Sequence, residues 1–165
     1  MYRLFLIATL LSLFNGCSRP NDDGQRLKAL AEKYFRGVYG CDSSVVDNLA
    51  AEDIAISYPI FQKLFNKSTI RGRVAAKHFA SRFCSKWSNA KITFHEVIAE
   101  SDRVVLIWSF RAINVGPTQP GVPPSGKEES WGGITFVRFN KAGRIEAEIG
   151  EESTPGPIER IIGRL

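Results

Sequence analysis

The chain has 165 residues, a formal net charge of +5 and 44% hydrophobic residues. Its basic residues are spread along the sequence without a run of five or six, so the composition favours a solvated surface and indicates no nucleic-acid partner. The alternative for the positive charge is an anionic surface or ligand. The sequence contains no CxxC pair, histidine–cysteine cluster, nucleotide-binding loop or nucleophile elbow. We therefore expect neither a metal site nor a cofactor.

Residues 1–16 predict an export signal. One positive charge, Arg3, precedes an apolar-rich run from Leu4 to Phe14. This run is too short for a transmembrane helix, which needs roughly 20 residues, and it suits the apolar region of a signal peptide. The alternative is a buried amino-terminal helix.

The end of this run, Leu-Phe-Asn-Gly-Cys, resembles the bacterial lipobox, in which a cysteine is lipidated and becomes the first mature residue. Gly16 and Cys17 match that motif, whereas Phe14 and Asn15 depart from its usual leucine and small residue. The resemblance implies that acyl chains on Cys17 anchor the protein to a membrane. Several chains on one residue give stable attachment, because each buried methylene contributes about 0.8 kcal/mol to membrane binding. The resemblance also implies export to the bacterial cell envelope, at the outer membrane if the cell is Gram-negative.

Residues 17–25 follow as the lipidated cysteine and a flexible tether, since they show no apolar periodicity. Residues 26–165 have a suitable length for one domain with its own core. Cys41 and Cys84 form an even pair in a chain that we expect to leave the cytosol, so a disulfide and two buried thiols both remain open.

The first half of the domain predicts three helices. Apolar residues recur at spacings of three and four over residues 26–40 and again over residues 73–87. Between them, Asp42-Ser43-Ser44 can cap a short helix that ends at Leu49. A brief strand is expected over residues 52–59.

The second half predicts four strands, over residues 91–100, 103–112, 130–139 and 144–152, which are rich in β-branched and aromatic residues. Helices followed by consecutive strands indicate an α+β fold with the helices against one face of an antiparallel sheet.

The alternation of side chains predicts which faces of these strands are buried. In the last strand, Ile145, Ala147 and Ile149 alternate with Glu146 and Glu148, which predicts one buried and one solvated face. The two middle strands are apolar on both faces, so the second face needs a cover: a ligand, a partner subunit or the chain terminus.

The segments AEDIAISYP, IRGRVAAKHFASRF, ITFHEVIAESDRVVLIWSFRA, GPTQPGVPPSGKEESWGGITFVRF and NKAGRIEAEIGEEST resemble the SnoaL-like polyketide cyclase family of the nuclear-transport-factor-two-like superfamily. The resemblance spans residues 26–165. It implies a cone-shaped, curved antiparallel sheet wrapped by N-terminal helices, with a pocket inside. Family members include isomerases, dehydratases, cyclases and domains without activity, so the fold alone does not fix the function.

The family's cyclases use an aspartate general base a few residues beyond a tryptophan of the last strand. On this chain the tryptophan position falls at Ile149 and the aspartate position at Ser153. A serine hydroxyl stays protonated near neutral pH and cannot replace a carboxylate base. Glu151 shares the parity of Ile149 and would supply a displaced carboxylate if the strand continues regularly, whereas Glu152 would point the other way.

Other pocket candidates come from the strands and the turn after the brief first strand. His95 is either an acid–base group in the cone or a half-exposed strand histidine. A ligand pocket is expected to be lined by Tyr58, Trp108, Trp131, Thr135 and Ile149, although the aromatic residues would serve equally well as core. A loop of about fifteen residues rich in glycine and proline, from Gly116 onwards, would act as a lid or a contact surface.

The sequence thus predicts a lipid-anchored cell-envelope domain that binds a small, largely apolar molecule. The alternative is a cyclase or isomerase in which Glu151 or His95 removes a proton next to a carbonyl. A homodimer formed through the open sheet face is a third hypothesis, since this arrangement is common in the family that the chain resembles.

Overall fold

The computed structural model describes residues 20–118 and 121–162. The predicted signal peptide and Cys17 lie outside the described residues. Within the described ranges, no helix combines the length and apolar composition needed to span a membrane.

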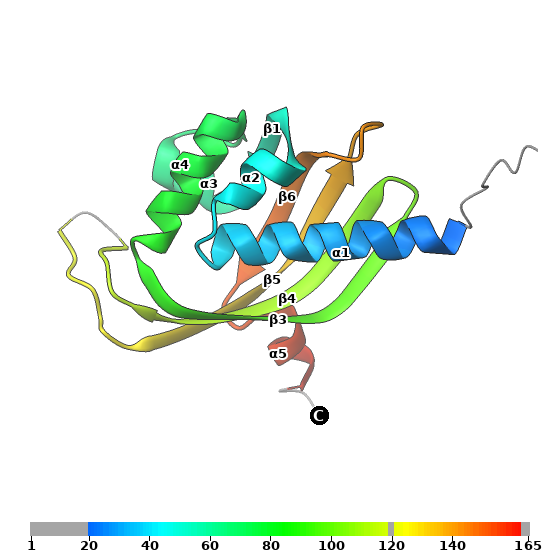
Figure 1. The fold of residues 1–165 in the computed structure, drawn as a ribbon. Helices are drawn as coiled ribbons and strands as arrows, with labels where there is room; N and C mark the ends of the chain where they lie inside the picture. Colours follow the sequence, from blue (N-terminus) through cyan, green and yellow to red (C-terminus); the bar gives the residue numbers. More distant parts are fainter. Residues whose placement is uncertain (1–19, 119–120, 163–165) are drawn as a thin grey trace, which may run out of the picture.

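The described chain forms an α+β fold in which helices cover one face of a curved sheet (Figure 1). The elements in chain order are α1 (Pro20–Tyr39), α2 (Ser44–Leu49), β1 (Ala50–Ser57), α3 (Pro59–Phe65), β2 (Ile70–Arg71), α4 (Arg73–Cys84), β3 (Trp87–Glu100), β4 (Arg103–Asn114), β5 (Glu128–Phe139), β6 (Ile145–Ser153) and α5 (Pro157–Ile162). The three predicted helices correspond to α1, α2 and α4, and the predicted strands to β1 and β3–β6. Helices α3 and α5 and strand β2 were not expected from the sequence.

The start of α1 differs from the prediction of a flexible tether over residues 17–25, because the helix already begins at Pro20. Proline suits the first helical turn, where its missing N–H is not needed. Asp22 and Asp23 lie in that first turn, where negative side chains interact favourably with the helix dipole. These polar residues carry no apolar periodicity, so the pattern did not reveal them.

The six strands form one sheet in the order β2-β1-β6-β5-β4-β3. All neighbouring strands are antiparallel except β1 and β6, which pair in parallel. Helices α1 to α4 lie over the concave face, and α5 lies against β4 and β5 on the opposite, outer face (Figure 1). The chain terminus therefore supplies part of the cover that the two middle strands were expected to need.

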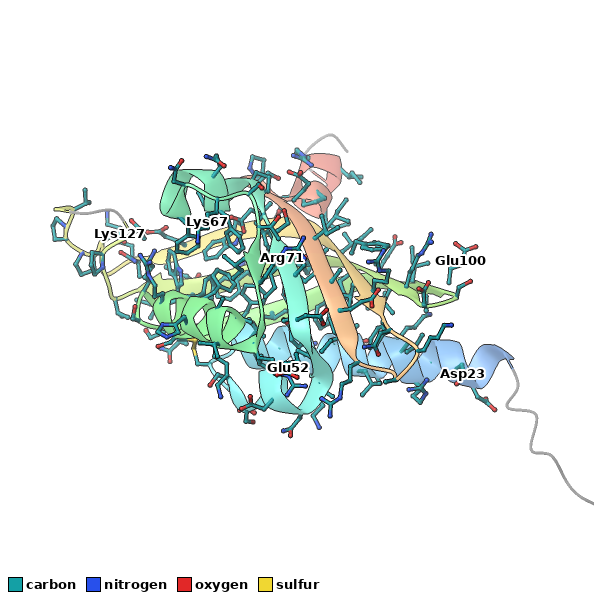
Figure 2. All side chains as sticks on the ribbon, turned by 90° about the horizontal axis from the view of Figure 1, so that it is seen from above. Asp23, Glu52, Lys67, Arg71, Glu100 and Lys127 are labelled. Atoms are coloured by element: carbon teal, nitrogen blue, oxygen red, sulfur yellow. A yellow bond between two sulfur atoms is a disulfide. The ribbon has the colours of Figure 1, made fainter. Side chains whose placement is uncertain are left out.

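The core lies between α1 and the concave face of the sheet. Phe35 of α1 contacts Trp108 of β4, with 5.1 Å between ring centroids, and both side chains are buried. Figure 2 shows side chains filling this space, with charged residues such as Glu52 and Glu100 at the periphery. The apolar residues that recur along α1 therefore lie on one face of the helix, and this face packs against the sheet.

An extra residue in β6 changes which of its side chains face the core. Phe139 of β5 pairs with Ile145, but the preceding Arg138 pairs with Ala147, so Glu146 is an additional residue on β6. A bulge of one residue reverses the side-chain alternation beyond it. The predicted faces are therefore wrong after Glu146: Glu148 is fully buried and Ile149 is 51% exposed.

Cys41 and Cys84 form a disulfide, with 5.6 Å between their Cα atoms. The bond joins the turn after α1 to the last residue of α4. Of the two possibilities that the sequence left open, a disulfide or two buried thiols, the structure has the disulfide. The bond ties together two helices that cover the same end of the sheet.

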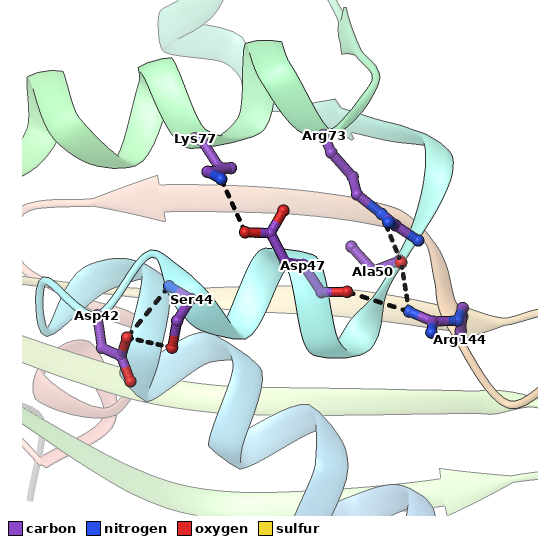
Figure 3. Close-up of polar contacts among 7 residues, drawn as sticks. All are labelled: Asp42, Ser44, Asp47, Ala50, Arg73, Lys77 and Arg144. Carbon is purple, nitrogen blue, oxygen red and sulfur yellow. Dashed lines mark hydrogen bonds and ion pairs between the residues drawn. The ribbon is translucent and has the colours of Figure 1, made fainter.

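Polar contacts also tie α2 to α4 and to the turn before β6 (Figure 3). Lys77 of α4 donates to the Asp47 carboxylate over 2.7 Å, and Arg144 donates to the Asp47 carbonyl over 3.2 Å. Arg73 and Arg144 both donate to the carbonyl of Ala50, at 3.1 and 3.3 Å. The bonds from the two arginines satisfy carbonyls at the end of α2, which have no helical partners.

Candidate ligand-binding site

A cavity of about 400 Å³ lies under α3 and α4, at the end of the concave face where α1 finishes. Eight of its sixteen lining residues are aromatic. This volume lies in the usual range of small-molecule sites, which are mostly apolar with a few polar groups.

Trp131 of β5 is in the centre of the aromatic wall. Its ring centroid lies 4.4 Å from that of Phe110 and 4.9 Å from that of Trp87. Phe79 and Phe83, four residues apart on α4, project from one helix face toward the same space. The rings around Trp131 therefore come from three strands, β3, β4 and β5, and from one helix, α4.

A buried carboxyl group lies behind this wall. The hydroxyls of Tyr39 and Tyr58, which both line the cavity, each donate to Oε1 of Glu148 over 2.7 Å. Trp108 donates from Nε1 to the Thr135 hydroxyl over 2.9 Å, and Thr135 lies 3.0 Å from the Tyr58 hydroxyl. The hydrogen bonds thus run from Trp108 through Thr135 and Tyr58 to Glu148.

The surroundings of Glu148 favour its neutral form. Burial raises the pKa of Glu148, and the hydrogen bonds from its tyrosine partners only partly oppose this. Burial and the nearby Glu148 carboxylate also raise the pKa of Tyr39 and Tyr58 well above the ordinary value. Oε2 of Glu148 has no hydrogen-bond partner among the described residues, so this oxygen can carry the proton.

Two carboxyl groups line the cavity itself, those of Glu129 and Glu152. Glu152 is the one on β6. It follows Glu148 by four residues, so the two side chains share the inner face of β6 beyond the bulge. Burial in the cavity wall raises the pKa of Glu152, and the adjacent Glu151 raises it further. A carboxyl group with a raised pKa in a cleft is a candidate proton carrier.

The expected inward orientation of Glu151 is wrong, because the bulge at Glu146 reverses the alternation of side chains beyond it. Glu151 is exposed and lies beside Ile134 on the outer face, as does Ile149. Ser153, at the family's aspartate position, lines the edge of the cavity and donates its hydroxyl to the carbonyl of Pro155 over 2.9 Å.

His95 also lies outside the cavity. The register of β3 and β4 shifts between Phe94 and Glu96, which makes His95 an extra residue on its strand. Its side chain is exposed, and Nε2 lies 2.7 Å from the Ser109 hydroxyl. This position agrees with the expectation of a half-exposed strand histidine and not with that of an acid–base group inside the cone.

The other residues expected in the pocket divide into two groups. Tyr58 and Trp131 line the cavity, whereas Trp108 and Thr135 are buried in the hydrogen-bonded chain behind it. Glu148 and Glu152 were not expected at the site, because regular alternation along the last strand placed both of them outside. A strand sequence alone carries no signal of a bulge whose extra residue fits the alternation.

The glycine- and proline-rich loop reaches the cavity through Thr118. Its base is fixed by the buried Asn114, whose side-chain amide donates to the carbonyl of Gly116 over 2.8 Å. The Asn114 side-chain oxygen accepts from the backbone N–H of Ser125 over 2.7 Å. Both ends of the loop are therefore attached to the end of β4.

The fold resembles several solved structures. TsrD from Streptomyces laurentii is 22% identical with a TM-score of 0.64, covering 86% of this chain and 97% of that one. A candidate SnoaL-like polyketide cyclase from Jannaschia sp. CCS1 is 15% identical with a TM-score of 0.66, covering 84% and 90%. IdmH, a candidate polyketide cyclase from Streptomyces antibioticus, is 17% identical with a TM-score of 0.66, covering 78% and 93%.

No curated protein sequence matches this chain. A family model described as the SnoaL-like domain matches residues 31–148, a range that runs from α1 to the buried Glu148 of β6. The chain therefore belongs to the SnoaL-like domain family.

Proposed function

We propose that the domain binds a small, largely apolar molecule in the cavity between α3, α4 and the sheet. The observation that carries this proposal is the aromatic lining of an accessible space of about 400 Å³. Aromatic rings that line such a space offer a ligand a large apolar area in a fixed geometry.

Replacing Trp131 with alanine is expected to weaken the binding of a neutral apolar probe by about tenfold or more, because one buried aromatic contact of 1.4 kcal/mol accounts for that factor. Fluorescence titration with N-phenyl-1-naphthylamine measures this change. Ile149→Ala is the matched control, since Ile149 is on the outer face and its loss should leave the affinity unchanged. Equal affinities for the wild type and Trp131→Ala would contradict the proposed site.

Export and a lipid anchor on Cys17 are part of the same proposal. The disulfide between Cys41 and Cys84 supports them, because disulfides persist mainly in oxidising compartments outside the cytosol. A Cys17→Ser variant expressed in bacteria should move from the detergent phase to the aqueous phase in a Triton X-114 partition. A protein that stays aqueous in both forms would count against the anchor.

The proposal also includes a homodimer through the outer face. Ile98, Val105, Phe136 and Ile149 form a row of cross-strand partners there, and both end residues are about half exposed. An exposed apolar patch of this kind is typical of a contact surface. Light scattering at several concentrations measures the mass, and a strictly monomeric protein at high concentration would exclude this part.

Proton transfer next to a carbonyl is the second candidate function. Glu152 favours it, because this carboxyl group lines the cavity and its pKa is raised above the ordinary value. In this reaction Glu152 would take the carbon-bound proton. The test is exchange of that hydrogen for deuterium in a bound ketone, which should be lost in Glu152→Gln.

A further inference from the structure

Two cations lie close together on the cavity wall. Arg82 is in the last turn of α4, and Lys86 follows four residues later in the turn before β3; both line the cavity. Partial burial, together with the positive charge of Arg82, lowers the pKa of Lys86.

Neither cation forms an ion pair with another described residue. Among residues 20–118 and 121–162, no ion pair and no side-chain hydrogen bond involves the guanidinium of Arg82 or Nζ of Lys86. Glu129 and Glu152 line the same cavity, but the Glu129 carboxylate accepts from the Ser125 hydroxyl instead. The lining therefore contains two positive groups without a partner of opposite charge.

Lys86 is also partly withdrawn from water. Its side chain is half-buried, and this burial is the larger cause of its lowered pKa. A partly desolvated ammonium group without a counter-ion is unfavourable. An anion that enters the cavity would therefore stabilise the charged form of Lys86.

The position of Lys86 is fixed by its backbone. Its carbonyl accepts from the N–H groups of Val115 and Gly116, over 2.8 and 3.2 Å, and from the side-chain amide of Asn114 over 3.2 Å. A side chain at Gly116 would collide with the carbonyl of Ser85, so only glycine allows this close approach. The loop base thus holds Lys86 at the cavity before any ligand binds.

Arg82 is held by a different contact. Its guanidinium carbon lies 5.0 Å from the centroid of the Phe65 ring, in a cation–π contact between α4 and α3. Within the described part of the chain, no hydrogen bond or ion pair uses the N–H groups of this guanidinium, so they are available to a ligand. A free guanidinium edge is the geometry that binds a carboxylate through two parallel hydrogen bonds.

We propose that the ligand is an amphipathic carboxylate: an apolar body that lies against the aromatic wall and a carboxylate that is bound by Arg82 and Lys86. This inference rests on the proposed function of the cavity and adds the chemical class of its ligand. Specificity for the carboxylate comes from the two cations, because leaving them unpaired disfavours a neutral analogue.

The experiment compares 1-pyrenebutyric acid with 1-pyrenebutanol, two fluorescent probes that share their apolar part and differ in the carboxylate. Wild-type protein is expected to bind the acid about tenfold or more tightly than the alcohol at pH 7. In the double variant Arg82→Gln, Lys86→Met, affinity for the acid should fall by about that factor. Affinity for the alcohol should change by less than about twofold.

Lys91 and Arg111 provide a matched control. They are cross-strand partners on the outer face, so Lys91→Met with Arg111→Gln removes the same net charge without touching the cavity. This control should keep the full preference for the acid, and circular dichroism checks that each variant is folded. A preference lost equally in the control would show that the effect comes from net charge and overturn the inference.

The two proposals fail in different ways. If wild-type protein binds both probes with the same affinity, the carboxylate site is overturned, whereas the apolar cavity stands. If neither probe binds, the proposed function of the cavity is overturned and the carboxylate site with it.

Discussion

Removal of the disulfide between Cys41 and Cys84 is expected to lower the free energy of unfolding by about 4 kcal/mol. The two cysteines are 43 positions apart, so the bond closes a long loop and restricts the unfolded chain. Loop-closure entropy for this length gives a value of that order at 25 °C. Urea denaturation of the double variant Cys41→Ala, Cys84→Ala measures the loss.

Reduction provides the matched control for this prediction. Dithiothreitol should lower the stability of the wild type toward that of the double variant and should leave the double variant unchanged. The wall of the cavity should loosen as well, because Tyr39 and Phe83 lie next to the two ends of the bond, with ring centroids 5.2 Å apart. An unchanged urea midpoint in the double variant would contradict the stabilising role.

Replacing Glu148 with alanine is expected to lower the free energy of unfolding by about 2–5 kcal/mol. The change removes a fully buried side chain and takes away the acceptor of the Tyr39 and Tyr58 hydroxyls. Glu148→Gln keeps the volume and one acceptor oxygen, so its loss should be clearly smaller. Denaturant titrations of both variants make this comparison.

The same group predicts how stability depends on pH. Burial raises the pKa of Glu148 in the folded state above its ordinary value of 4.5, so folding favours the protonated form. The resulting contribution to stability is fully present below the unfolded pKa and is lost as pH rises through the folded pKa. The free energy of unfolding of the wild type should therefore fall as pH rises above about 4.5.

Glu148→Gln should remove this part of the pH dependence, because the amide does not titrate. Glu152→Gln is the matched control. Burial also raises the pKa of Glu152, but this side chain keeps contact with solvent, so the variant should remove a smaller part of the pH dependence. The measurement is a series of urea titrations from pH 4 to pH 8. A Glu148→Gln variant with the same pH dependence as the wild type would assign the effect to another group.

The sequence predicted the elements whose signal is local. The helical spacing of α1 and α4 and the β-branched runs of β3 to β6 gave their approximate limits, because burial on one face imposes a regular period. The short helix α3 was missed because Pro59 and its neighbours were assigned to the end of a strand. Seven residues give too little periodicity to distinguish the two.

The candidate site was less predictable, because it depends on pairing between strands. The alternation in β6 looks regular through Glu146, and only its register against β5 reveals the extra residue that turns Glu148 and Glu152 inward. Likewise, Arg82 and Lys86 become neighbours of one cavity only when α4 packs beside α3. Tyr58 and Trp131 were found because aromatic residues in a domain of this family commonly line its interior.

The early start of α1 has a consequence for where ligands would be exchanged. If Cys17 carries a lipid, the residues up to Pro20 can span only about 10 Å, so the beginning of α1 would be held at the bilayer surface. A helix of 20 residues is about 30 Å long, and Tyr39 at its other end lines the cavity. The length of α1 would then set the greatest distance that the cavity can reach from the bilayer surface, about 30 Å beyond the tether. The tilt of α1 would decide whether a ligand enters from the lipid or from the aqueous phase.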